Sequence, residues 1–109
     1  MKLIVTEISG QWAMALRRLL PAGGFPLCET RTLAECKQEL VAAPTSVVLA
    51  ELNRNTAPTL LDFVASCQRK LPQSLVAVAA DQAWSSWQSI LAEAGAALTI
   101  FSPRKLTPL

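Results

Sequence analysis

Histidine is absent from this chain of 109 residues. The absence removes the commonest metal ligand and general base of proteins, and it excludes Ser-His and Cys-His catalytic pairs. Cysteine is scarce, and Cys28, Cys36 and Cys67 lie far apart without a CxxC pair. We therefore interpret these cysteines as small core hydrophobes of a reduced, cytoplasmic protein, not as partners in disulfide bonds.

Charge and long apolar runs are also lacking. The net charge is only +2, and Lys and Arg do not cluster as they do in domains that follow a phosphate backbone. No stretch approaches the roughly 20 apolar residues that cross a bilayer. The apolar run after Lys2 is shorter than the core of a signal peptide. We therefore expect neither nucleic acid nor a membrane as a partner.

The residues that are present predict one packed domain over 1–109, because 51% of them are hydrophobic and the length suits one small core. Short apolar runs alternate with longer segments of helical period, which is typical of repeated βαβ units. This alternation predicts an α/β fold with a doubly wound parallel sheet. The predicted strands are 2–6, 25–30, 46–51, 74–79 and 98–102.

Four helices are predicted between these strands. The first ends near Pro21, the second begins with a capping box of Thr32 and Glu35, the third follows Pro58, and the fourth covers 82–96 and ends at Gly95. The residues predicted to face inward are Trp12, Leu16, Leu19 and Leu20, then Leu33, Cys36, Leu40 and Val41, then Leu60, Leu61, Val64, Cys67 and Leu71, and finally Trp84, Trp87, Ile90, Leu91 and Ala94.

Four stretches add a resemblance to this pattern: "LIVTE", "RRLLPAGGF", "VVLAELN" and "AEAGAALTIFSP". Through them the chain resembles, over nearly its whole length, the receiver domain of bacterial two-component response regulators. The last stretch is the most specific, because receivers often read Ala-x-Ala-Gly-Ala before a strand that ends in Lys-Pro. The resemblance implies a flavodoxin-like sheet of five strands in the order 2-1-3-4-5.

The chemistry of a receiver depends on a few residues, and this chain differs at nearly all of them. Receivers phosphorylate a strand-end Asp with the help of an acidic pair that holds Mg²⁺, a hydroxyl residue, and a Lys that neutralises the phosphoryl group. The resemblance places these positions, in that order, at Glu51, at Thr6 and Glu7, at Ala79, and at Ser102 before Pro103.

These replacements predict a degenerate receiver without catalytic activity or cofactor. Glu51 carries one methylene more than Asp, and a displacement of about 1 Å can cost roughly a hundredfold in rate. Ser102 supplies no positive charge to a transferred phosphoryl group. Thr99 stands where receivers often carry a switching Tyr or Phe.

An ion site is an open alternative for the two carboxylates, Glu7 and Glu51. Together with a loop carbonyl near Asn53 they offer oxygen ligands to Mg²⁺. The other interpretation is that both are solvated carboxylates near helix N-termini, where the helix dipole favours negative charge. Arg54 is a candidate ion-pair partner of Glu51.

Two features predict a contact surface. Only "RKLTPL" follows Pro103, so we expect the fifth helix of receivers to be missing, unless the chain is a fragment of a longer protein, and the first helix to be the main cover of one face of the sheet. An open apolar face of this kind marks a partner site. The second feature is the pair Trp84 and Trp87. Both could lie in the core or at an interface, and Trp84 is the better candidate for an interface anchor. The candidate interface residues are Trp12, Trp84, Trp87, Thr99 and Phe101.

We therefore expect a non-catalytic, receiver-like interaction module that binds a protein partner or forms a homodimer. One alternative is an atypical receiver that still accepts phosphate or Mg²⁺ near Glu51. Another is a small-molecule or nucleotide site at the strand C-termini, as in other flavodoxin-like folds. Against a nucleotide, "TEISGQW" holds a single glycine, Gly10, instead of a glycine-rich phosphate loop.

Overall fold

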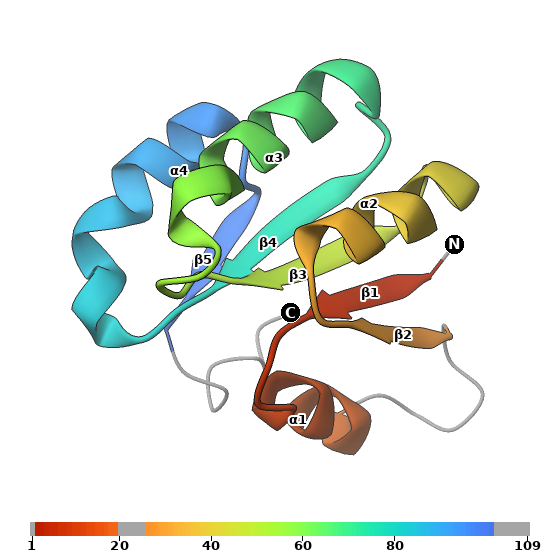
Figure 1. The fold of residues 1–109 in the computed structure, drawn as a ribbon, viewed down its shortest axis with the longest axis horizontal. Coiled ribbons are helices and arrows are strands. Elements are labelled where there is room, and N and C mark those ends of the chain that lie inside the picture. The colour runs from red at the N-terminus through yellow and green to blue at the C-terminus, as the bar shows by residue number, and fades with distance from the viewer. Residues whose placement is uncertain (1, 20–25, 102–109) are drawn as a thin grey trace.

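The computed structural model describes residues 2–19 and 26–101, which form one parallel sheet with helices on both faces (Figure 1). The elements in chain order are β1 (Leu3–Thr6), α1 (Gln11–Leu19), β2 (Leu27–Thr30), α2 (Leu33–Ala42), β3 (Val47–Glu51), α3 (Ala57–Lys70), β4 (Leu75–Ala79), the 3₁₀ helix η1 (Gln82–Trp87), α4 (Gln88–Ala94) and β5 (Leu98–Ile100).

All five strands run parallel in the order β2-β1-β3-β4-β5, which is the flavodoxin-like arrangement. The predicted fold class is thus confirmed, and each strand lies inside its predicted range. Leu3 pairs with Leu27 on one side and with Val47 on the other, and Val47 pairs with Leu75. Side chains at equivalent positions of neighbouring strands therefore point to the same face of the sheet.

The sheet separates two apolar layers (Figure 1). On one face α2, α3 and α4 cover side chains such as Ile4 and Val78 with fully buried leucines. On the other face α1 is the one helix among the described residues, and its Trp12 and Leu16 pack against Val5. The backbone of α1 is described as far as Leu19, but the side chain of Leu19 and the whole of Leu20 are not. The inward positions predicted for these two leucines therefore lie outside the described residues.

The start of α2 confirms the predicted capping box. The amide of Glu35 donates to the hydroxyl of Thr32 at 3.1 Å, and the amide of Thr32 donates to the Glu35 carboxylate at 3.1 Å. Cys36 and Leu40 are buried as predicted, but Val41 is 59% exposed. That prediction was wrong because Val41, five residues after Cys36, is turned about 140° around the helix axis.

In α3, Leu60, Val64 and Cys67 are buried as predicted, and Phe63 joins them. The predicted fourth helix divides into two parts, since a 3₁₀ turn, η1, precedes α4. Three residues per turn put Trp84 and Trp87 on the same side of η1, which explains the contact between their indoles.

In α4, the second half of the predicted fourth helix, the buried leucine and the terminal glycine are as predicted, and Ile90 is not. Leu91 is fully buried in α4, whereas Ile90 is 50% exposed, contrary to its prediction. Gly95 ends α4 with φ of +119°, a left-handed conformation that suits glycine.

The described ranges, 2–19 and 26–101, contain α1 to α4 and no fifth helix. The sequence prediction about the fifth helix concerns residues 102–109, which lie outside this part of the chain. The predicted site positions Ser102 and Pro103 belong to the same segment. No helix among the described residues is long and apolar enough to cross a membrane.

Candidate functional site

The carboxyl ends of β1, β3 and β4 meet at one edge of the sheet, where doubly wound folds place their ligand sites. Glu7 follows β1, Glu51 ends β3, and Asp81 lies in the loop between β4 and η1. Sequence reasoning identified the first two of these carboxylates and missed Asp81. The signal for Asp81 was a charged residue two positions after the end of a buried strand.

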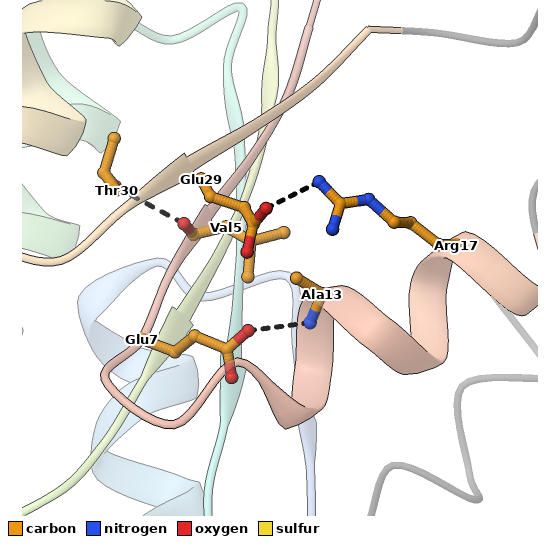
Figure 2. A network of polar contacts seen from close by, with 6 residues as sticks. All are labelled: Val5, Glu7, Ala13, Arg17, Glu29 and Thr30. Carbon is orange, nitrogen blue, oxygen red and sulfur yellow. Dashed lines mark hydrogen bonds and ion pairs between the residues drawn. The ribbon is translucent and has the colours of Figure 1, made fainter.

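Glu7 is a buried helix cap. Its side chain is only 6% exposed, and its two carboxylate oxygens accept hydrogen bonds from the amides of Trp12 at 2.9 Å and Ala13 at 2.7 Å. Figure 2 shows this carboxylate against the first turn of α1. Gly10, which precedes the helix, has no side chain with which to cap it, so Glu7 satisfies these amides.

This geometry corrects one of the two interpretations of Glu7. It lies near a helix N-terminus, as expected, but it is not solvated. Both carboxylate oxygens already accept a backbone hydrogen bond, so any metal would compete with the helix for them. The role visible for Glu7 is therefore to join the end of β1 to the start of α1.

Thr6 lies on the opposite face from Glu7. Its hydroxyl is buried and shares a hydrogen bond of 2.7 Å with the hydroxyl of Thr30. The Thr30 hydroxyl also donates to the carbonyl of Val5 at 3.4 Å (Figure 2). Thr6 and Glu7, which the resemblance aligns with an acidic pair, thus serve different layers of the fold.

The loop after β3 is held by its own polar groups. The Asn53 side-chain amide donates to Glu51 Oε1 at 2.9 Å, while Asn53 Oδ1 accepts from the amides of Asn55 and Thr56. The Thr56 hydroxyl donates to the Glu51 carbonyl at 2.8 Å. A loop carbonyl near Asn53 was predicted as a possible Mg²⁺ ligand. The carbonyl of Asn53 itself accepts a 2.8 Å hydrogen bond from the amide of Ala57.

The ion pair predicted between Glu51 and Arg54 is not among the ion pairs of the described residues. The ion pairs recorded there join Lys2 to Glu39 and Arg17 to Glu29, the latter from α1 to β2 (Figure 2). Arg54 is exposed, and the described ranges contain no group of three His, Cys, Asp or Glu placed to hold a metal ion.

A cavity of about 560 Å³ opens at this edge of the sheet. We call it the tryptophan cavity, because all three tryptophans of the chain line it. Among residues 2–19 and 26–101, those that line it are Trp12, Glu51, Leu52, Asn53, Arg54, Ala80, Asp81, Ala83, Trp84 and Trp87.

The predicted interface residues differ in exposure. Trp12 borders the cavity but is buried between α1 and the sheet. It is therefore not an exposed anchor. Trp84 and Trp87 are partly buried, with ring centroids 5.3 Å apart and planes at 84°, and they pack against the α2–α4 core. Thr99 and Phe101 are also partly buried.

Two other predicted positions have a plain structural role. Ala79 is fully buried and pairs with Glu51 in the β3–β4 register, and the Leu52 amide donates to its carbonyl at 2.7 Å. Cys36 and Cys67 are buried in the core, as expected of small hydrophobes. Burial raises the pKa of the Cys36 thiol to about 11 and also raises the pKa of Cys67. The fold thus holds both as unreactive thiols.

Fold and site together define a flavodoxin-like α/β domain with a tryptophan-lined cavity at the carboxyl ends of its strands. Comparison of the chain with models of protein families, with curated proteins and with solved structures gives no match. Its function is therefore inferred from the geometry of the fold and of the site.

Proposed function

We propose that this chain is a non-catalytic, receiver-like interaction module that acts in cytoplasmic signalling or regulation without phosphorylation and self-associates. The observation that carries the proposal is a pair of exposed leucines, Leu75 and Leu98, on the sheet face that α1 covers only in part. We define the open sheet face as Leu3, Leu27, Val47, Leu75 and Leu98.

The alternation of side chains along the strands places these residues on the α1 side. Leu75 has the same parity in β4 as Ala77, and Leu98 has the same parity in β5 as Ile100. Ala77 and Ile100 both belong to the core under α1.

The most exposed residues of the open sheet face lie on β4 and β5. Leu75 is 56% exposed and Leu98 is 43% exposed, while Val47, in register with Leu75, is partly exposed. Sequence reasoning expected an open face but did not name these residues. The signal for them was the apolar residues of β4 and β5, together with the fact that the sequence predicts mainly the first helix on this side of the sheet.

A second copy of the chain is the occupant that we propose for the open sheet face. Complete burial of one leucine contributes about 1.5 to 3 kcal/mol. A twofold contact buries each exposed leucine twice, once from each copy, and a row of aliphatic side chains is complementary to itself. The five residues of the open sheet face are uncharged, so a contact confined to them desolvates no charged side chain; Glu29, on the same side of β2, is paired with Arg17 of α1.

The absence of phosphoryl transfer is proposed from the residues of the site. Glu7 is engaged by Trp12 and Ala13, Glu51 is longer than the Asp of receivers, and Ala79 has no hydroxyl. We expect no covalent phosphate after incubation with acetyl phosphate and Mg²⁺, measured by intact mass spectrometry. A stoichiometric, Mg²⁺-dependent phosphate adduct would favour the atypical receiver instead.

Self-association is tested by the solution mass from light scattering over a range of concentrations. We expect a dimer for the unmodified chain and a monomer for the double variant Leu75→Gln, Leu98→Gln. Val41→Gln is the matched control, because Val41 is equally exposed but lies on α2, across the sheet. It should remain a dimer.

Circular dichroism of each variant checks that its fold is retained. A monomeric unmodified chain at all concentrations contradicts self-association, as does a dimer that survives the double substitution.

A further inference from the structure

We propose that the tryptophan cavity binds an organic cation, an alkylated ammonium or a guanidinium group. This proposal does not depend on self-association. The cavity lies at the carboxyl ends of β3 and β4, whereas Leu75 stands at the opposite, amino end of β4.

Aromatic surface is the first observation. The chain holds three tryptophans, and α1 and η1 bring them to one cavity from distant parts of the sequence. Trp84 and Trp87 are only partly buried and nearly perpendicular, so indole surface remains available to a ligand. The face of an indole carries negative charge density and attracts a cation within about 6 Å of the ring centre.

Charge is the second observation. Among the described residues of the lining, Glu51 and Asp81 contribute two carboxylates and Arg54 contributes one guanidinium. Glu51 is partly buried, so its charge is less screened by salt than a fully exposed one. Indole faces and an excess of carboxylates both favour a cation over an anion.

The size of the cavity limits which cations fit it. A volume of about 560 Å³ falls in the range of roughly 300 to 1,000 Å³ that is usual for small-molecule sites. It is too large for a bare ammonium ion, so the ligand carries an organic body that contacts the apolar part of the lining. A free quaternary amine and the arginine side chain of a peptide share this chemistry.

The experiment compares cations with their neutral isosteres by isothermal titration of the full chain. The first pair is choline and dimethylbutanol, in which carbon replaces the charged nitrogen. The second pair is a blocked Gly-Gly-Arg-Gly-Gly peptide and the same peptide with citrulline for arginine. We expect saturable binding of at least one cation, about tenfold tighter than its neutral partner. The tighter of the two cations then identifies the source as a free amine or a peptide.

Substitutions test the sign of the charge in the cavity. We expect Trp84→Leu and Glu51→Gln each to weaken cation binding about fivefold. Arg54→Gln should tighten it, because this variant removes the like charge. Arg69→Gln is the matched control: it changes the net charge equally, but Arg69 lies in the last turn of α3, outside the cavity lining, and should leave the affinity unchanged.

Three outcomes overturn the proposal. One is equal binding of cations and neutral isosteres, and another is the absence of binding by any probe. The third is weaker binding of choline or of the arginine peptide to Arg54→Gln, because the loss of a like charge should strengthen the binding of a cation. All three leave the dimerisation test unaffected, so failure here is distinguishable from failure of the proposed function.

Discussion

The carboxylate of Glu7 accepts a 2.7 Å hydrogen bond from the backbone amide of Ala13, six residues later in the chain. A second hydrogen bond, from Trp12, completes the cap of α1. Of the described helices only α1 lies on its face of the sheet (Figure 1), so this carboxylate ties the start of that layer to the end of β1.

Glu7→Ala should lower the free energy of unfolding by about 2 kcal/mol, since it leaves two amides of α1 without their acceptor. Glu7→Gln should cost less, because its amide oxygen still accepts one of the hydrogen bonds. Urea denaturation measures both. Glu29→Ala is the control, because the Arg17–Glu29 pair is exposed and its loss should cost less than about 1 kcal/mol. Equal losses for Glu7→Ala and Glu29→Ala would show that the cap contributes little.

Two glycines should differ in their response to alanine. Gly10 has φ of +82° with open space around it, so Gly10→Ala costs only backbone strain, about 1 kcal/mol. At Gly95 a Cβ would also lie 2.9 Å from Gln68 Oε1 and 3.1 Å from Gln68 Cβ, so Gly95→Ala should cost more, up to about 3 kcal/mol. Thermal melts compare the two variants. Adding Gln68→Ala should recover part of the loss at Gly95 and none at Gly10.

The Cys36 thiol should make stability depend on pH in the alkaline range. Burial raises its pKa from 9.0 to about 11, so the folded state holds the proton more tightly than the unfolded state. The resulting stability is fully present below about pH 9 and is lost as the pH rises through about 11, by at most about 3 kcal/mol.

Urea denaturation across this pH window tests the effect of Cys36. Cys36→Ala should show a shallower decline than the unmodified chain. Lys2, whose pKa is raised mainly by its hydrogen bond to Glu39, titrates equally in both proteins and cancels in the comparison. Parallel curves for the two proteins would contradict the role of Cys36.

Thr6 and Thr30 form a buried hydroxyl pair that suits a double-mutant cycle. Thr6→Val and Thr30→Val should each cost about 1 to 2 kcal/mol, because each leaves a buried hydroxyl with fewer partners. The double variant should cost less than the sum, since no orphaned hydroxyl remains. Chemical denaturation gives the four free energies of unfolding, and strictly additive losses would show that the hydroxyls do not interact.

The fold followed from the sequence because the central strands β3 and β4 are nearly continuous apolar runs, as is typical of a parallel sheet with helices on both faces. "VVLA" at 47–50 can hardly lie elsewhere than in the centre of a sheet, and it forms β3. The capping box of Thr32 and Glu35 was predictable for the same reason, because its signal is local.

The features that escaped prediction depend on tertiary contacts. A spacing of three residues between Trp84 and Trp87 fits an α-helix and a 3₁₀ helix alike, so the break before α4 had no local signature. Glu7 caps a helix that begins four residues after it, beyond the usual capping distance. Trp12 was assigned correctly to the inner side of α1, but only the packed structure shows that it also borders the cavity.

The place of β1 between β2 and β3 affects how the chain folds during synthesis. During synthesis β1 appears before its neighbour β3, which arrives only with residues 47–51, after α1, β2 and α2. Until then one edge of an apolar strand has no hydrogen-bonding partner, which makes the nascent chain prone to aggregate. The central position that stabilises β1 in the folded protein therefore also leaves β1 prone to misfolding until β3 has been synthesised.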